Sequence, residues 1–206
     1  LEATLAEKGQ HLPFEPPRFG AASTVGGMVA AGLAGPARVS VGGVRDYMLG
    51  ATMINGRGEV LSFGGPVMKN VAGYDVSRAL AGSMGILGVI AEVSLKVLPA
   101  PRATSTLRFE TALQAEALAA MQRVALSPMP LAASAWCNGF LLLRFSGARA
   151  AVDAALATLG GNKLQAPEAQ MFWNGLRDQR DAFFVAAGAQ VAEGATLWRM
   201  SVPSTT

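Results

Sequence analysis

Side chains able to act as acids, bases, nucleophiles or metal ligands are scarce in this sequence, which has a single histidine, His11, and a single cysteine, Cys137. A Ser/His/Asp or Cys/His site would need His11, which stands among prolines far from any good nucleophile, so we expect a surface or ligand-side residue. Cys137 falls on a predicted strand and is expected to be a small buried apolar residue. No catalytic residue is assigned, and no metal site is expected, because no His/Cys cluster can form.

A first candidate site is the glycine-rich stretch 24–36, "TVGGMVAAGLAGP", which holds four glycines and no charged side chain. It is not a P-loop, since no Gly-Lys-Ser/Thr follows, and it lacks the G-x-G-x-x-G of dinucleotide sites. Ser23 or Thr24 is a plausible N-cap of a short helix. The N–H groups at this helix start, beside Gly26 and Gly27 without Cβ atoms, could approach a phosphate, although such glycine pairs are as often structural.

A second glycine-rich stretch, "AGSMGILGV" at 81–89, has glycines at 82, 85 and 88 just before a predicted strand. The three glycines could form a tight turn, or they could let a flat aromatic ligand lie against the backbone. Two such loops without catalytic side chains suggest that the reactive group belongs to a bound cofactor, which the protein positions.

The composition describes a folded chain with no strong preference for nucleic acid. Of its 206 residues, 51% are hydrophobic and 15% charged, which suits one large domain or two small ones with a real core. The net charge is +3 with scattered basic residues, so no nucleic-acid partner is expected. The apolar runs 21–37 and 79–91 are too short or too interrupted by glycine to cross a bilayer, and the lone cysteine fits a cytoplasmic compartment. Residues 1–9 are typical of a helix end, which suggests a piece of a longer protein.

The elements that would position the loops are an antiparallel sheet with short helices. Residues 46–54 and 59–63 flank "NGRG" and predict a β-hairpin. Asp75 is a candidate cap for a short helix over 76–81. A strand then starts at Val89, and alternation puts one set of apolar side chains on a single face: Val89, Ala91, Val93, Leu95 and Val97.

After a hinge at 98–103 the order of elements changes. The pattern predicts a strand at 104–110, helices at 111–125 and 148–159, and between them a hairpin around Asn138-Gly139. A final strand is expected from 163–167 or from 196–202. Strand-helix-strand-strand-helix-strand is the ferredoxin-like order.

These residues also resemble a known family. "STVGGMVAAGLAGP", "VRDYMLG", "KNVAGYD" and "ALAGSMGILGVIAEVSLKVLP" are similar to the second FAD-binding subdomain of the vanillyl-alcohol oxidase / p-cresol methylhydroxylase (PCMH-type) flavoproteins, and within them to the FAD-binding subunits of bacterial glycolate oxidases. The resemblance implies an α+β fold, with a PCMH-type subdomain over 1–100 followed by a ferredoxin-like domain over 101–206. It also implies that the chain is the middle of a subunit, lacking the first subdomain with its pyrophosphate loop, and that it would bind FAD weakly or not at all alone.

The function implied by the resemblance is the oxidation of a 2-hydroxy acid, glycolate to glyoxylate, with a hydride passing to non-covalent FAD. Electrons would leave through partner subunits, a larger flavin subunit and an iron-sulfur subunit, in the cytoplasm or at the cytoplasmic face of the inner membrane. Lys69 and Tyr74 are candidates near the flavin ring or substrate, or else structural. The cofactor-binding residues implied by the motif positions are Thr24, Gly26 and Gly27 at the pyrophosphate, Arg45 and Asp46 near the same cleft, and Gly82, Ser83, Gly88 and Ile90 along the cofactor.

Two alternatives remain open. The chain could belong to another flavoprotein of the family, such as a D-lactate dehydrogenase. It could also be a non-catalytic assembly subunit that keeps the flavoprotein fold as a docking surface. The apolar residues near 126–137, including Trp136, would suit such an interface, although packing in a core is the more common use of such residues.

Overall fold

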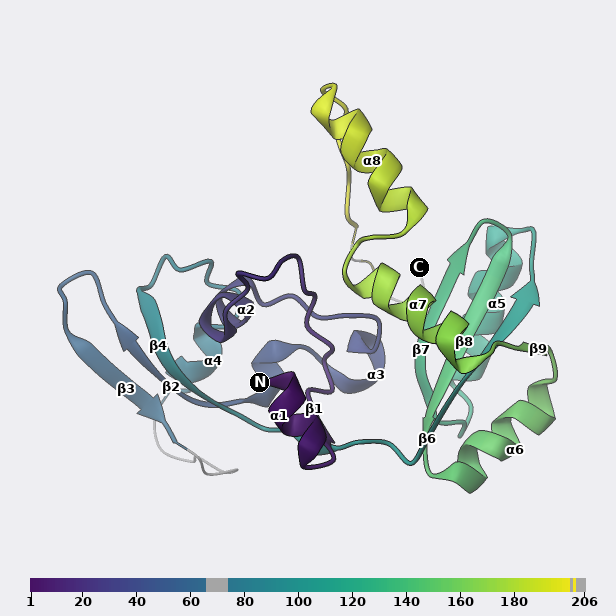
Figure 1. The fold of residues 1–206 in the computed structure, drawn as a ribbon, viewed down its shortest axis with the longest axis horizontal. Helices are drawn as coiled ribbons and strands as arrows, with labels where there is room; N and C mark the ends of the chain where they lie inside the picture. The colour runs from purple at the N-terminus through teal and green to yellow at the C-terminus, as the bar shows by residue number, and fades with distance from the viewer. Residues whose placement is uncertain (66–73, 201, 203–206) are drawn as a thin grey trace. The chain divides into compact units, whose positions relative to one another are not determined.

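The computed structural model describes residues 1–65, 74–200 and 202, and the chain forms two compact units, Leu1–Ala100 and Pro101–Thr206 (Figure 1). Among the described residues, unit 1 holds a two-stranded and a three-stranded sheet, unit 2 holds a four-stranded sheet, and each unit has its own buried hydrophobic clusters. In unit 1 the elements are α1 (Glu2–Glu7), β1 (Gln10–His11), α2 (Val25–Ala31), α3 (Arg38–Val41), the 3-10 helix η1 (Val44–Tyr47), β2 (Met48–Ile54), β3 (Val60–Gly64), α4 (Val76–Ala79), β4 (Val89–Leu95) and β5 (Leu98–Pro99).

The larger sheet of unit 1 has the order β3-β2-β4, the smaller one pairs β1 with β5, and both are antiparallel. The predicted hairpin is confirmed: β2 pairs with β3, and Asn55 closes the turn by accepting the N–H groups of Arg57 and Glu59 through its side-chain oxygen. Helices α2 and α4 pack against this sheet (Figure 1). Phe14, Val29 and Met48 are almost fully buried in one core cluster, and residues of both glycine-rich stretches pack in or against this cluster.

A β-bulge in β4 changes the predicted alternation of this strand. Glu92 pairs with Thr52 and Ile90 pairs with Met53, so Ala91 is an extra residue without a partner on β2. The prediction of a single apolar face was therefore right for Val93, Leu95 and Val97, which pack on the core, and wrong for Val89 and Ala91, which are exposed. An extra residue shifts a two-residue period by one, so Ile90 packs on the core in place of Ala91.

Unit 2 has the expected strand-helix-strand-strand-helix-strand order, followed by two further helices. Its antiparallel sheet has the order β7-β8-β6-β9, and Asn138 and Gly139 form the hairpin turn with φ values of 49° and 79°. The elements are β6 (Ala103–Glu110), α5 (Gln114–Ala125), β7 (Leu131–Cys137), β8 (Phe140–Gly147), α6 (Arg149–Leu159), β9 (Asn162–Lys163), α7 (Ala166–Arg177) and α8 (Ala182–Ala192).

Both faces of the unit 2 sheet are packed. Leu107, Leu143 and Phe145 form one core with Val124 of α5 and Val152 of α6. On the other face, α7 contributes Trp173 to a smaller cluster with Ala133, Leu142 and Leu164. The α+β class with antiparallel sheets and flanking helices, expected from the sequence, is confirmed.

The closing strand of this sheet is shorter than either predicted segment. It is β9, Asn162–Lys163, which pairs with Arg108 and Leu107 of β6. The alternative at 196–202 is wrong, because residues 196–200 are not in a strand. Two consecutive glycines with positive φ, Gly160 and Gly161, turn the chain from α6 into β9.

Candidate functional site

The helix start predicted at "TVGG" is formed by Thr24. This residue has extended backbone angles, and its hydroxyl accepts the N–H of Gly27 at 3.0 Å, so it is the N-cap of α2. Ser23 instead donates its hydroxyl to the carbonyl of Gly20 at 2.8 Å. The Gly27 N–H is thus engaged within the cap in this structure.

The two glycines of this start face different surroundings. A Cβ at Gly26 would lie 3.1 Å from the carbonyl oxygen of Ile90, so this position lets α2 approach β4 closely. Gly27 faces the other way and lines a groove of about 280 Å³ together with Thr24, Phe19 and Met28. Of the three pyrophosphate candidates, Thr24 and Gly27 therefore share a solvent-accessible groove, whereas Gly26 packs on the predicted site residue Ile90.

The backbone of the second glycine-rich stretch, 81–89, hydrogen-bonds to the last residues of α2. The N–H of Gly82 donates to the carbonyl of Val29 at 3.0 Å, and the N–H of Met84 donates to that of Ala30 at 2.9 Å. A Cβ at Gly32, which caps α2 with φ of 62°, would be 2.7 Å from the Cα of Gly82. The structure thus brings the two glycine-rich stretches, far apart in sequence, into direct contact.

Ser83 carries a polar atom without a partner. Its Oγ is buried and makes no hydrogen bond to any residue that the structure describes. A buried hydroxyl without a partner is unfavourable, and such an atom is a candidate for binding a ligand. Ser83 is therefore a predicted site residue with a buried hydroxyl whose hydrogen-bonding capacity is unused within the described structure.

Gly88 has a backbone role at the start of β4. Its φ is 145°, and a Cβ there would lie 2.3 Å from the carbonyl oxygen of Ile54 and 2.6 Å from the methyl of Met53. Only glycine permits this approach of β4 to the end of β2.

Arg45 and Asp46 lie on the 3-10 helix η1, next to the start of α4. The Asp46 carboxylate accepts the N–H of Gly43, the N-cap residue of η1, at 2.8 Å, so Asp46 stabilises the start of this helix from within its first turn. Arg45 is exposed, and its positive charge is one of the smaller influences that lower the pKa of Asp75. The first cause is the hydrogen bond from the Ser77 hydroxyl, 2.8 Å from the Asp75 carboxylate. Asp75 also caps α4, as predicted, by accepting the N–H of Arg78.

The two residues expected near the flavin ring or the substrate, Lys69 and Tyr74, make no contact with each other that the structure describes. Tyr74 is 96% exposed. Lys69 lies outside the described residues.

His11 and Cys137 have different outcomes. His11, expected at the surface or beside a ligand, is half-buried in β1, and its Nδ1 donates to the carbonyl of Leu98 in β5 at 3.1 Å. Cys137 is exposed, so the prediction of a buried residue was wrong, because it is the last residue of β7 at the hairpin turn. Partial burial, with a smaller influence of Asp181, raises the pKa of its thiol.

Trp136 is not an exposed docking residue. Its side chain packs against the core of unit 2, and its ring N–H donates to the carbonyl of Thr111 at 2.8 Å. Trp136, the aromatic residue that suggested an interface near 126–137, is therefore used within the fold of unit 2.

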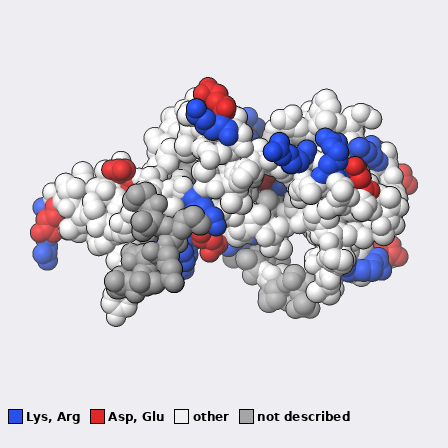
Figure 2. Space-filling model, turned by 90° about the horizontal axis from the view of Figure 1, so that it is seen from below, with Lys and Arg blue, Asp and Glu red and all other residues white. Residues whose placement is uncertain are grey.

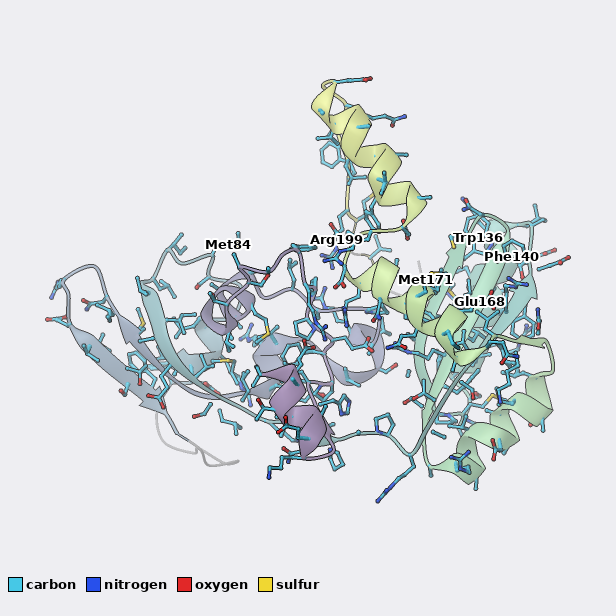
Figure 3. The ribbon with its side chains drawn as sticks, viewed as in Figure 1. Met84, Trp136, Phe140, Glu168, Met171 and Arg199 are labelled. Atoms are coloured by element: carbon cyan, nitrogen blue, oxygen red, sulfur yellow. The ribbon has the colours of Figure 1, made fainter. Side chains whose placement is uncertain are left out.

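A feature that the sequence analysis missed is the exposed apolar surface of the second loop. Met84 is 74% exposed and Ile86 84% exposed, and Leu87 and Val89 are also exposed. Met84 points away from α2 (Figure 3). Consecutive apolar side chains in water are typical of a surface that a ligand or another chain segment covers. The signal was available in "MGILGV", which has no polar side chain.

Within residues 1–65, 74–200 and 202, no group of three His, Cys, Asp or Glu side chains could hold a metal ion. Over the same residues, no helix combines the length and apolar character needed to cross a membrane.

Comparison with known proteins supports the resemblance. Residues 1–79 match a family model described as FAD binding domain. The chain is 48% identical over 204 residues to the Escherichia coli (strain K12) protein named glycolate oxidase subunit GlcE, an alignment that covers 99% of this chain and 55% of that relative. The chain therefore spans about half the length of this relative.

Two shorter matches each cover 41% of the chain. The chain is 36% identical over 85 residues to the Bacillus subtilis (strain 168) glycolate oxidase subunit GlcD, covering 41% of this chain and 18% of that one. It is 40% identical over 85 residues to an Anaerostipes hadrus D-lactate dehydrogenase, with the same coverage. The similarity to the FAD-binding subunits of glycolate oxidases, inferred from the motifs, is confirmed.

A solved structure shares the fold. An alkyldihydroxyacetonephosphate synthase superposes with a TM-score of 0.66, covering 89% of this chain and 41% of that chain at 20% identity. This likeness supports the fold class.

Proposed function

We propose, from the match of residues 1–79 to the FAD binding domain family model, that the chain is the FAD-binding part of a 2-hydroxy-acid oxidoreductase of the glycolate oxidase type. The observation that carries this proposal is the 48% identity to a protein named as a glycolate oxidase subunit, sustained over 99% of the chain. The D-lactate dehydrogenase match covers only 41% of the chain. It therefore supports the similarity to this group of flavoproteins and gives little support for D-lactate as the substrate.

The residues around the two glycine-rich stretches fit a flavin cofactor. Thr24 and Gly27 line a groove at the start of α2 that could take the pyrophosphate, and the unpaired Oγ of Ser83 offers a hydrogen bond. The exposed side chains of Met84 and Ile86 offer an apolar surface for the cofactor or for chain that covers it. Bound non-covalently, FAD would supply the acceptor for a hydride from the carbon that bears the substrate hydroxyl.

In this proposal the residues of the chain position the cofactor and set the polarity around it. Gly82 and Gly88, with positive φ, would bring backbone close to the cofactor, and Ile90 would hold β4 against Gly26. Arg45 would add positive charge on the side of η1, where Asp46 fixes the backbone by accepting the N–H of the N-cap residue Gly43. Tyr74 and Lys69 would lie nearer the ring or the substrate. The acid-base group of the reaction is not assigned to a residue of this chain.

The domain boundaries follow the same reasoning. Residues 1–100 would be the second subdomain of a PCMH-type FAD-binding domain, and residues 101–206 a ferredoxin-like domain. The two compact units and the β-α-β-β-α-β order of unit 2 support this division.

The protein would work as one subunit of a complex. The relatives named glycolate oxidase subunits GlcE and GlcD support a multi-subunit enzyme. We extend this to a larger flavin subunit and an iron-sulfur subunit as partners, with the complex in the cytoplasm and at most peripherally associated with the inner membrane.

The test is an anaerobic titration of the purified full-length protein, alone and assembled with its partner subunits. Glycolate is expected to bleach the flavin absorption bands, and D-lactate to bleach them more slowly. Faster bleaching by D-lactate would favour the other flavoprotein activity. A folded, colourless protein that still binds the partner subunits would contradict the enzyme role and support an assembly subunit.

A further inference from the structure

A large polar cavity lies within unit 2, in residues that the proposed flavin function does not use. Its volume is about 750 Å³, within the range of about 300–1,000 Å³ common for small-molecule sites. The described residues that line it include four cationic side chains from four separate segments and one carboxylate: Arg102, Arg144, Arg149, Lys163 and Asp153.

The charge of this lining is unusual for the chain. Four cations against one carboxylate give the lining the same net charge, +3, as the whole sequence. The rest of the chain is therefore electrically balanced, and its excess positive charge is concentrated in one concave region. Figure 2 shows several Lys and Arg side chains gathered over the right-hand part of the molecule, with Asp or Glu side chains beside them. A concave surface with one sign of charge attracts ligands of the opposite sign.

One of the cations is held rigidly. Arg144 is only 9% exposed, and its guanidinium lies 4.9 Å from the centre of the Trp173 ring. Trp173 is itself fixed, because its ring N–H donates to the buried Thr106 hydroxyl at 2.9 Å. Stacking on an aromatic ring and burial restrict the guanidinium before any ligand arrives, which lowers the entropic cost of binding.

Two helix starts reinforce the positive potential. Arg149 is the first residue of α6, and Gln165 is the N-cap of α7, and both line the cavity. Neither helix start has a side-chain cap hydrogen bond in the described structure. The N–H groups of a helix start carry partial positive charge, which adds to that of the nearby cationic side chains.

We propose that this cavity binds a small polyanion that carries two or more carboxylate or phosphoryl groups. A single carboxylate cannot reach cations on β8, α6, β9 and the segment before β6, whereas a ligand with several anionic groups can. The neutral side chains Gln170 and Asn174 of α7 also line the cavity and can hydrogen-bond the uncharged parts of such a ligand.

The test uses the full-length protein and isothermal titration calorimetry at constant ionic strength, with citrate and pyrophosphate as probes and glycolate as the single-carboxylate comparison. We expect saturable binding of citrate or pyrophosphate with one site per chain, at least about tenfold tighter than glycolate. The preferred probe identifies the ligand as a polycarboxylate or a phosphoryl compound. Affinity should fall as salt is raised.

The variant Arg149→Gln/Lys163→Gln removes two exposed cations and should weaken binding by about tenfold or more. The matched control is Arg123→Gln, an exposed arginine on α5 of the same unit, outside the cavity, which should bind like the wild type. Arg144→Met should also weaken binding, provided thermal unfolding shows that it folds. The proposal is overturned if neither probe binds, if glycolate binds equally well, or if the double variant binds as the wild type does.

Discussion

The clearest perturbation of the flavin site is Ser83→Ala, because the same change should have opposite effects with and without the cofactor. The Oγ of Ser83 is buried and has no hydrogen-bond partner among the described residues. The backbone around it is fixed independently, since the N–H groups of Gly82 and Met84 donate to α2. The substitution therefore removes the hydroxyl without removing the contacts that hold the loop.

The expected magnitudes follow from this unpaired hydroxyl. A buried polar group without a partner costs about 1–3 kcal/mol, so Ser83→Ala should raise the unfolding free energy of the cofactor-free protein by about 1 kcal/mol. If the hydroxyl hydrogen-bonds the cofactor, the variant should bind FAD about 3- to 10-fold more weakly, the equivalent of about 0.5–1.5 kcal/mol.

The assay pairs urea unfolding of the full-length apoprotein with a fluorescence titration of FAD. Ser77→Ala is the matched control, because Ser77 is equally small, 2% exposed, and donates to the Asp75 carboxylate at 2.8 Å. That variant should lose about 1 kcal/mol of stability. The reasoning is refuted if Ser83→Ala destabilises the apoprotein as Ser77→Ala does, or if its FAD affinity equals that of the wild type.

Three further predictions concern the fold around the sites. In Gly88→Ala the new Cβ would lie 2.3 Å from the Ile54 carbonyl oxygen, so urea unfolding should show a loss of about 3 kcal/mol or more in the free energy of unfolding. Gly85 also has a positive φ but has open space around it, so Gly85→Ala should lose only about 1 kcal/mol. Equal losses in the two variants would contradict the steric argument. Trp173→Phe leaves the buried Thr106 hydroxyl without its donor and should cost about 1–3 kcal/mol in the same assay, so an unchanged midpoint would exclude that bond. The hydrogen bond from the Ser77 hydroxyl holds the pKa of Asp75 below its usual value, so the stability that the charged carboxylate contributes is complete above about pH 4 and is lost as the pH falls through the lowered pKa. The melting temperature of Asp75→Asn should therefore fall less between pH 5 and 3 than that of the wild type. An equal fall in both proteins would count against this role of Asp75.

Local chemistry explains which elements could be predicted from the sequence. The Asn138-Gly139 turn and the caps at Thr24 and Asp75 depend on a few neighbouring residues, and all three form as expected. The bulge at Ala91 depends on how β4 aligns with β2, which the alternation of one strand does not contain. The exposure of Cys137 has the same origin, because it is set by the end of a strand within a tertiary sheet.

The motifs of the candidate site could be found in the sequence, but the arrangement of their residues in space could not. The sequence indicated two glycine-rich loops near a cofactor, yet it could not separate Gly27, which lines a groove, from Gly26, which packs on Ile90. Nor could it show that Gly82 touches the end of α2. The basic cavity of unit 2 was missed, because its cations are scattered in the sequence and meet only in the folded sheet.

The central claim, that this chain belongs to a flavin-binding subunit, is tested most directly by the FAD content of the purified full-length protein. The absorption spectrum and the FAD released on denaturation should together give about one FAD for each chain. Gly27→Val, in the groove beside Thr24, should lower that content while the circular dichroism spectrum stays unchanged. A folded protein without flavin bands that takes up no added FAD would contradict the account.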